Sequence, residues 1–265
     1  MREDGSFADI PLVLGDTELA LTLIEKSVRG RPDSFRLLNA YSLYCAQKDP
    51  AYGALLRRGG HNFIDGKPLA FLMHRRVSAV SQVRGPALFL ACLDRMRSEP
   101  HFLFGGSEDL LDALRSHLLQ RFPGLNLVGT CAPPFGTFSA QDRALYLDEI
   151  RMARPAIVWV ALGTPKQDVE AALITELAGV TTIAVGAAFD FAAGRKPEAP
   201  VLLRTLGLEW AFRLYSEPRR LWRRYLFGNI YFIRAAFAEL RWPTRSRSSR
   251  PTVGGTSSDE GDRAV

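Results

Sequence analysis

The chain has 265 residues and a net charge of +6, and its content of 47% hydrophobic and 23% charged residues is typical of a globular protein with one sizeable core. Its three cysteines, Cys45, Cys92 and Cys131, lie far apart without a Cys-x-x-Cys spacing, which argues against a structural zinc site and for a reducing compartment. No basic segment precedes an apolar run at the start, so we expect no signal peptide. The longest apolar stretch, residues 177–189, is too short to span a bilayer, so we expect no transmembrane helix and interpret this stretch as a core strand.

The sequence predicts the first secondary-structure elements with different clarity. Residues 1–10 show no clear period, whereas residues 16–28 predict an amphipathic helix with an aspartate cap. Residues 34–40 predict a short strand that ends at Asn39. Because asparagine is a common turn former, this position alone does not indicate a ligand site.

Asp65 follows a short apolar strand within residues 61–68 and precedes Gly66. One interpretation is an ordinary Asp-Gly turn. The other is a carboxylate at the rim of a sheet, where it could take a proton from a hydroxyl group. The residues alone leave both interpretations open.

A glycine pair marks the next turn. After a helix predicted over residues 86–97, a strand over residues 102–104 ends in Gly105 and Gly106 and leads into a strong helix over residues 108–122. Doubly wound folds approach a nucleotide with this order of strand, glycine turn and helix. However, the chain has no Gly-x-Gly-x-x-Gly and no Walker lysine, so we expect neither a dinucleotide site nor a P-loop.

Residues 156–168 are the most strongly patterned stretch. An apolar, β-branched run predicts a strand buried on both faces, and a polar turn then opens a helix. Thr164 is expected to cap that helix, with Pro165 in its first turn. Lys166 and Gln167 would stand at the helix N-terminus, which suits phosphate or sugar oxygens. The alternative is an ordinary strand–helix turn with solvated ends.

Strands and helices alternate from residue 34 to residue 190, with further strands predicted over residues 125–129 and 180–185 and a further helix, capped by Ser139, over residues 139–153. This alternation predicts a Rossmann-like α/β fold, in which helices cover both faces of a parallel sheet. In such a fold, ligands bind outside the carboxyl ends of the strands.

The pattern changes after residue 199. Short packed helices are predicted up to residue 218 and a longer helix over residues 219–240, and the composition of residues 242–265 predicts a disordered tail. Between residues 204 and 250 the chain has eleven arginines and three acidic residues, a net charge of +8, so the remainder is nearly neutral. This cationic section is expected to bind the phosphates of a nucleotide, an anionic membrane or a nucleic acid.

The long helix is expected to have two different surfaces. Four arginines, Arg219, Arg220, Arg223 and Arg224, share one surface, while aromatic and aliphatic residues load the other. Such a helix suits a membrane interface, with its rings at headgroup depth. The alternative is a helix docked on the body with a solvated arginine face.

Several catalytic and metal-binding patterns are missing from the sequence. No Asp-x-Asp pair is present to hold a divalent ion on a nucleotide diphosphate, and the four histidines, His61, His74, His101 and His117, fall at unrelated spacings. No Gly-x-Ser-x-Gly elbow occurs. If the chain binds a diphosphate, its arginines must neutralise the charge.

A series of short motifs runs in order from about residue 8 to residue 240. They are Leu38-Asn39-Ala40, Ile64-Asp65-Gly66, Phe104-Gly105-Gly106, residues 127–130, residues 161–167, residues 185–190 with Ala193-Gly194, Ala199-Pro200, residues 207–214 and residues 217–220. Together they resemble the WecG/TagA/CpsF glycosyltransferases, a family that includes the teichoic-acid N-acetylmannosaminyltransferase.

The resemblance implies an inverting glycosyltransferase that moves a sugar from a UDP-sugar to an undecaprenyl-diphosphate-linked saccharide in cell-envelope or exopolysaccharide synthesis. It implies no essential metal, no cofactor and no nucleic-acid partner. Asp65 corresponds to the proposed base of the family. The motifs and the resemblance together mark as substrate-binding residues Asn39, Gly105, Gly106, Thr164, Lys166, Gln167, Gly186, Arg213, Arg220, Arg223 and Arg224.

The resemblance also implies how the chain is divided. Residues 1–198 would form the catalytic α/β domain, and residues 199–241 a helical appendage that supplies arginines to the donor diphosphate and attaches the enzyme to the cytoplasmic face of the plasma membrane. We expect the site to be complete only when the appendage folds over it. Relatives can self-associate, so a homo-oligomer is a further expectation.

Three positions depart from the family pattern. Leu37 stands where relatives tend to have Thr, residues 82–85 read Gln-Val-Arg-Gly where many have Arg-Val-x-Gly, and Asp168 replaces the usual Glu. The sequence therefore assigns neither the donor sugar nor the acceptor sugar. Two other classes stay open, a nucleic-acid-binding protein that uses the arginine-rich end and a non-catalytic membrane-associated scaffold of a polysaccharide complex.

Overall fold

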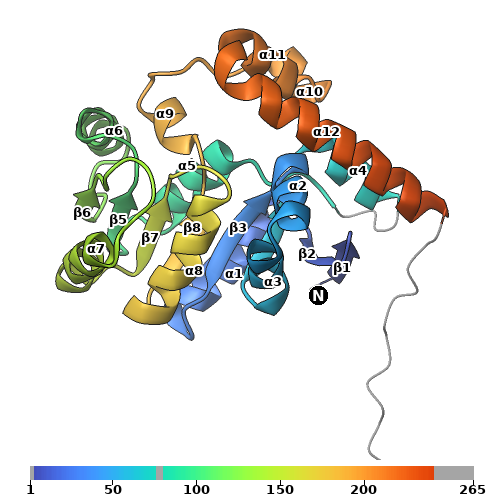
Figure 1. Ribbon diagram of the computed structural model, residues 1–265. Coiled ribbons are helices and arrows are strands. Elements are labelled where there is room, and N and C mark those ends of the chain that lie inside the picture. The colour runs from blue at the N-terminus through green and yellow to red at the C-terminus, as the bar shows by residue number, and fades with distance from the viewer. Residues whose placement is uncertain (1–2, 76–79, 242–265) are drawn as a thin grey trace, which may run out of the picture.

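A six-stranded parallel sheet forms the centre of the protein, as Figure 1 shows for the computed structural model, which describes residues 3–75 and 80–241. The strands lie in the order β4-β3-β8-β7-β5-β6, and each neighbouring pair is parallel. They are β3 Ser34–Leu38, β4 His61–Ile64, β5 His101–Phe104, β6 Leu127–Cys131, β7 Ile157–Val160 and β8 Thr181–Ala184. The predicted α/β fold is confirmed.

Helices cover both faces of this sheet because its side chains alternate between two apolar cores. Leu37 and Phe63 belong to one core, with α1 Thr17–Arg29, α5 Gly85–Arg95, α6 Glu108–Arg121 and α9 Ala188–Ala192. The next residues, Leu38 and Ile64, face the other side. The helices on that side are α2 Ala40–Lys48, α3 Pro50–Arg58, α7 Ala140–Ala153 and α8 Lys166–Ala178.

An N-terminal hairpin includes most of residues 1–10, where the sequence shows no clear hydrophobic periodicity. Strands β1 Glu3–Phe7 and β2 Ile10–Leu14 pair antiparallel, and Ala8 and Asp9 form the turn with positive φ angles of 49° and 61°. Two positive φ angles are typical of the tight turn that joins twisted antiparallel strands, although glycine or asparagine is the usual residue there. Helix α4 Lys67–His74, like α2 and α3, fills a segment with no predicted element.

The observed boundaries correct several predictions. Residues 177–189 are not one core strand, because β8 occupies only residues 181–184 between the end of α8 and the start of α9. Strand β6 begins two residues later than predicted. The predicted caps of α1 by Asp16 and of α7 by Ser139 are confirmed.

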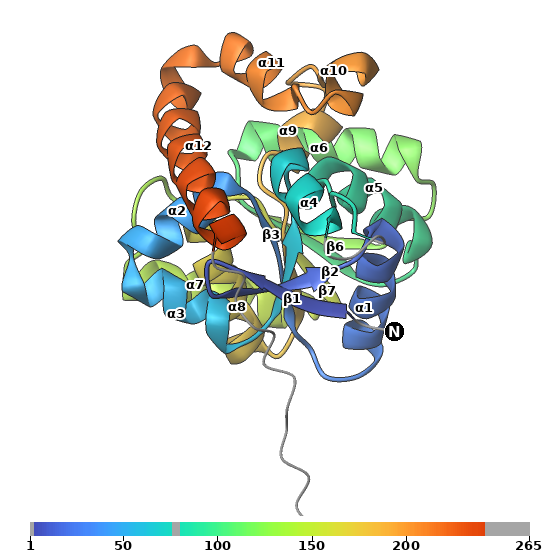
Figure 2. The same ribbon diagram turned by 90° about the vertical axis from the view of Figure 1, so that its right-hand side faces the viewer.

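The C-terminal appendage consists of α10 Val201–Thr205, α11 Glu209–Ser216 and α12 Pro218–Arg241, which arch over the body in Figures 1 and 2. Part of α12 is docked on α2 and the hairpin. Gly228 allows the close approach, since a Cβ there would lie 3.1 Å from the backbone of Tyr41. Phe227 stacks on Tyr44 with ring centroids 5.9 Å apart, and Phe232 lies 5.6 Å from Phe7. The predicted alternative of a docked helix therefore holds for this side of α12.

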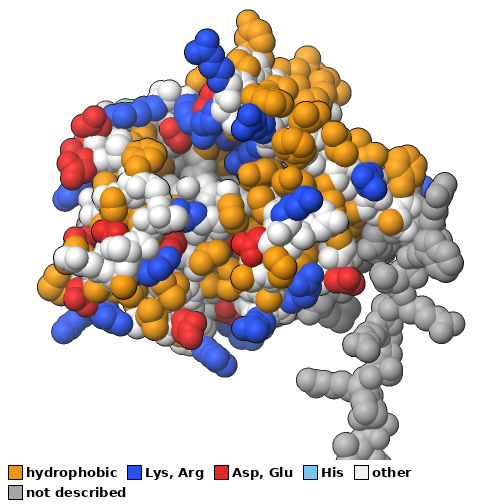
Figure 3. All heavy atoms as spheres, in the orientation of Figure 1, with side chains coloured by type: hydrophobic (Ala, Val, Ile, Leu, Met, Phe, Trp, Pro, Cys, Tyr) orange, Lys and Arg blue, Asp and Glu red, His pale blue; other side chains and the backbone are white. Residues whose placement is uncertain are grey.

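The other side of the appendage leaves many apolar side chains in solvent, and Figure 3 shows them gathered over α11 and α12. They include Tyr215, Trp222, Leu226, Ile230, Ile233 and Phe237. An apolar surface of this kind marks contact with another phase or molecule. Within residues 3–75 and 80–241, none of the helices combines the length and apolarity needed to cross a bilayer.

Candidate active site

A cavity of about 980 Å³ lies between the carboxyl ends of the strands and the appendage. Nine cationic and three acidic side chains line it, so its field favours an anionic ligand. Its position agrees with the rule that open α/β sheets bind ligands beyond the carboxyl ends of their strands.

The cavity brings together most of the residues predicted for the site. Those that line it are Asn39, Asp65, Gly106, Thr164, Lys166, Gln167, Gly186, Arg213, Arg220 and Arg224. Two predicted residues are not among its lining. Gly105 packs behind the wall with φ +120°, where a Cβ would lie 2.6 Å from the carbonyl oxygen of Ala161. Arg223 is exposed and stacks over Trp222, 5.2 Å from the ring centroid.

Asp65 directly follows β4. Its position is fixed because the parallel pairing with β3 continues for one more residue: the backbone N–H of Asp65 donates to the carbonyl of Leu38 at 2.7 Å. Its carboxylate accepts a hydrogen bond from Gln82 Nε2 at 3.3 Å. Burial raises the pKa of Asp65 above its usual range, and the charge of Glu209 adds to the rise. The Gln82 hydrogen bond and the positive charges of Arg213 and Arg224 oppose it. A carboxylate held in this way can act as a base near neutral pH.

Two arginines of the appendage face the cavity without a counterion. In the described part of the chain, no acidic side chain forms an ion pair with Arg213 or Arg224. Both are half-buried, and each guanidinium lies over a ring, Arg213 5.5 Å from the centroid of Phe191 and Arg224 5.0 Å from that of Tyr41. Burial and then the charge of Arg213 lower the pKa of Arg224. A half-buried, unpaired cation is costly, so a bound anion would stabilise this arrangement.

Arg220 differs from these two arginines. Its Nε lies 2.5 Å from Glu217 Oε2, and Glu217 also contacts Lys196 at 3.4 Å. The four arginines predicted to share one surface are therefore separated by the docking of α12. Arg224 turns inward and Arg220 lines the rim, while Arg219 and Arg223 are exposed.

The turn before α8 is built differently from the prediction. Thr164 does not cap the helix: the cap residue is Pro165, and no side chain closes the first turn. Lys166 is also engaged, since its ammonium donates to the carbonyl of Gly136 and lies 3.2 Å from the centroid of the Phe138 ring. It thereby ties the loop of residues 131–139 to the cavity wall. Gln167 folds back onto the turn, where its Oε1 accepts from the Gly163 N–H at 3.1 Å.

Asn39 caps a helix with one end of its side-chain amide and faces the cavity with the other. Its Oδ1 accepts from the backbone N–H groups of Tyr41 and Ser42 at 3.0 and 3.3 Å, which caps α2. The turn-forming interpretation of Asn39 is therefore confirmed. Because Oδ1 faces the helix and no described residue accepts from Nδ2, the amide N–H₂ group is free to donate to a ligand in the cavity.

Sequence reasoning missed the residues that hold the appendage over the cavity. Arg84 donates from Nε and Nη2 to the two carboxylate oxygens of Glu209, both at 3.0 Å, and also lies 3.5 Å from Glu198. Lys67 Nζ donates to the carbonyl of Thr205 at 2.7 Å. A bidentate guanidinium–carboxylate pair fixes both position and orientation.

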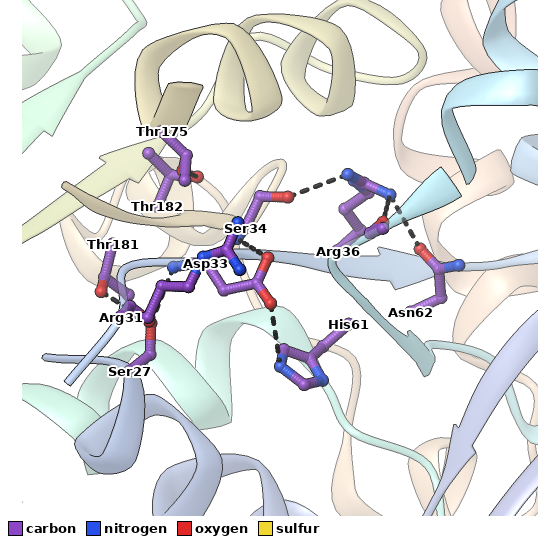
Figure 4. A network of polar contacts seen from close by, with 11 residues as sticks. Ser27, Arg31, Asp33, Ser34, Arg36, His61, Asn62, Thr175, Thr181 and Thr182 are labelled. Atoms are coloured by element: carbon purple, nitrogen blue, oxygen red, sulfur yellow. Dashed lines mark hydrogen bonds and ion pairs between the residues drawn. The ribbon is translucent and has the colours of Figure 1, made fainter. Parts of the chain in front are cut away.

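A second polar network lies away from the cavity, and Figure 4 shows it around Arg36. Arg36 Nη2 donates to Ser34 Oγ at 2.8 Å, and Nη1 lies 3.3 Å from Asn62 Oδ1. Nearby, Asp33 contacts His61 at 3.3 Å. These residues join the strands β3 and β4 and do not line the cavity, so we assign them a structural function.

No group of three or more His, Cys, Asp or Glu side chains is placed to hold a metal ion within the described ranges 3–75 and 80–241. The side chains that do meet at the cavity include three carboxylates, four amides and six guanidinium groups, and Asp65 is the carboxylate that stands at the end of a strand. Such a set can accept a proton, donate hydrogen bonds to hydroxyl groups and neutralise a phosphate.

An α/β protein with a cation-rich cavity beyond its strands, closed by a helical appendage, has a site suited to an anionic ligand. The sequence model of the glycosyl transferase WecG/TagA/CpsF family matches residues 6–246, so the chain belongs to this family. It is therefore a glycosyltransferase. The match extends across both the body and the appendage.

Proposed function

We propose that the protein is an inverting, metal-independent glycosyltransferase that moves a sugar from a UDP-sugar to an undecaprenyl-diphosphate-linked saccharide in cell-envelope or exopolysaccharide synthesis. The observation that carries this proposal is the meeting of Asp65 with the unpaired guanidinium groups of Arg213 and Arg224 in one cavity. Membership of a glycosyltransferase family favours catalysis over the nucleic-acid-binding and scaffold alternatives.

In the proposed reaction Asp65 takes the proton of an acceptor hydroxyl group while that oxygen attacks the anomeric carbon of the donor. The bond between the anomeric carbon and the β-phosphate oxygen breaks, and UDP leaves with the bonding electrons. Attack from the side opposite the leaving group inverts the configuration. Arg213, Arg220 and Arg224 stabilise the negative charge that develops on UDP.

The remaining lining residues have proposed positioning functions. The Asn39 amide and the Gln167 side chain would hold donor hydroxyl groups, and Gly106 and Gly186 would let the nucleotide approach the backbone. Thr164 would contribute a hydroxyl group at the same edge. Since Lys166 is tied to Gly136, we propose that it acts on the donor by holding the loop of residues 131–139 in place.

We further propose that the enzyme works at the cytoplasmic face of the plasma membrane as a peripheral protein. The exposed apolar residues of α11 and α12 lie beside exposed arginines, Arg219 and Arg223, which suits the boundary between headgroups and acyl chains of an anionic membrane. Self-association remains a prediction that analytical ultracentrifugation in detergent would test.

The proposal is tested by incubating the purified protein with a panel of UDP-sugars and a polyprenyl-diphosphate-saccharide, with and without a chelator. We expect one UDP-sugar to be consumed, the product to have the inverted anomeric configuration, and the chelator to have no effect. Asp65→Asn should abolish transfer while UDP still binds, as measured by calorimetry. Transfer at the wild-type rate by Asp65→Asn, or loss of transfer with the chelator, contradicts the proposal.

A further inference from the structure

The cavity has a second part whose chemistry differs from that of the cationic part. Between α4 and α12 it is lined by Leu69, Tyr225, Asn229, Phe232 and Ile233, which we call the apolar arm. Figures 1 and 2 both show α4 beside α12, below α11. None of these five side chains is charged, although Lys67 of α4 and Arg224 of α12 line the cavity as well. A nucleotide-sugar has no apolar group that would gain by entering it.

The arm follows from the periodicity of α12. Tyr225, Asn229 and Ile233 are spaced four residues apart and therefore lie on one face of the helix, with Phe232 beside them. From Tyr225 to Ile233 the helix rises by about 12 Å. Leu69 of α4 is buried and lines the same cavity. The arm thus takes its lining residues from two helices, α4 and α12.

The inner end of the arm lies close to the proposed base. Burial raises the pKa of the Tyr225 hydroxyl group, and the negative charge of Asp65 adds to that rise. The Tyr225 ring also lies 6.0 Å from that of Trp210 in α11, so the two rings form an aromatic wall at this end. Arg224, the neighbour of Tyr225, supplies a positive charge there.

The outer end of the arm opens onto apolar surface. Ile233 is 52% exposed although it lines the cavity. Beyond it Phe237 of α12 is 62% exposed, and Phe71 of α4 is 71% exposed. The path from Asp65 to the outside therefore changes from charged to aromatic to aliphatic.

We propose that the apolar arm binds the lipid-linked acceptor, with its saccharide at Tyr225 and its first isoprenoid units against Phe232 and Ile233. This inference rests on the proposed function and adds to it the route by which the acceptor reaches the base. The hydrocarbon chain leaves the protein between α4 and α12, at the side where the exposed apolar residues lie. The saccharide and the first isoprenoid units lie in the cavity, while the rest of the lipid stays outside.

The test compares two isoleucines on the same helix. Ile233 lines the arm, whereas Ile230, which is 48% exposed, does not. Ile233→Asp and Ile230→Asp place the same charge on α12 at nearly equal exposure, so they match in their effect on folding and on general membrane contact. Ile233→Trp keeps the position apolar but narrows the arm.

Transfer would be measured in detergent with two acceptors that share the saccharide diphosphate and differ in chain, one polyprenyl and one short alkyl. We expect Ile233→Asp and Ile233→Trp to raise KM for the polyprenyl acceptor about tenfold or more, which corresponds to a loss of about 1.4 kcal/mol of binding. KM for the short acceptor and for the UDP-sugar should stay within about twofold, as should all three values in Ile230→Asp.

Equal KM values for the polyprenyl acceptor in Ile233→Asp and Ile230→Asp overturn the inference. If both variants lose activity only on vesicles, and to the same extent, the surface of α12 contacts the membrane without guiding the lipid, and the inference is again wrong. These results leave the proposed function intact, because the wild-type protein transfers sugar in each case. Absence of transfer by the wild-type protein to either acceptor refutes the proposed function itself.

Discussion

The ion pair between Arg84 and Glu209 should hold the appendage closed over the cavity, and its removal should reduce both stability and activity. The two side chains are only 18% and 23% exposed, and the guanidinium donates two hydrogen bonds of 3.0 Å. Exposed pairs contribute about 0–1 kcal/mol, whereas breaking a buried pair costs about 3–5 kcal/mol. We therefore expect Arg84→Met or Glu209→Gln to cost about 2 kcal/mol, with Tm lower by about 4–8 °C.

The same free energy limits the effect on catalysis. If all of it favours the closed position of α11, the ratio of closed to open molecules falls by up to about 30-fold, and kcat/KM falls by at most that factor. The double variant should be no worse than the worse single variant, because either change alone removes the pair. Both quantities are measured by thermal unfolding and by initial rates of sugar transfer.

Arg95 provides a matched control. It forms a comparable bidentate pair with Glu25, with N–O distances of 2.9 and 3.3 Å, but this pair joins α5 to α1 away from the cavity. Arg95→Met should lower Tm without changing kcat/KM at a temperature where it is folded. Additive losses in the Arg84 and Glu209 variants, or unchanged kcat/KM in both, would refute the coupling between this ion pair and closure.

Three further predictions concern titration and the loop beside the cavity. A base must be ionised to act, so activity should fall as pH drops through the raised pKa of Asp65. Glu209→Gln should move the acidic limb of the pH–activity profile to lower pH, and Gln82→Ala should move it to higher pH. A shift in the same direction in the two variants would contradict the assignment. Lys166→Met should release the neighbouring loop and raise KM for the UDP-sugar several-fold, or about 1 kcal/mol, with KM for the acceptor unchanged; equal changes in the two KM values would count against it. Burial raises the pKa of Asp168 to about 6, so the folded protein keeps a proton on Asp168 that the unfolded chain releases near pH 4. The free energy of unfolding should therefore fall as pH rises from about 4 to about 6. Asp168→Asn should remove this fall in thermal scans across pH, and an unchanged profile would show that Asp168 does not cause it.

The central fold was predictable from sequence because its signals are local. Apolar runs such as residues 157–160 are buried on both faces, and the caps of α1 and α7 lie where short-range patterns place them. The hairpin was missed because Ala8 and Asp9 form its turn without the glycine or asparagine that usually signals one.

The site was predictable to the extent that strand ends determine it. Asn39 and Asp65 follow neighbouring parallel strands, and the carboxyl ends of such strands meet at one edge. The pair of Arg84 and Glu209 was not predictable, since 125 residues separate the two partners. Which arginine of α12 turns inward depends on the rotation of the docked helix about its axis, and a single sequence does not specify that rotation.

The contact between Phe7 and Phe232 has a consequence for biosynthesis. The first hairpin and the last helix share one apolar core, so the hairpin emerges from the ribosome long before its partner is made. During that interval the parts of the hairpin and of α2 that contact α12 stay uncovered, and chaperones or the membrane surface can bind them. Because four of the six arginines that line the cavity lie on the appendage, the nascent chain completes the cavity lining only when synthesis is nearly finished.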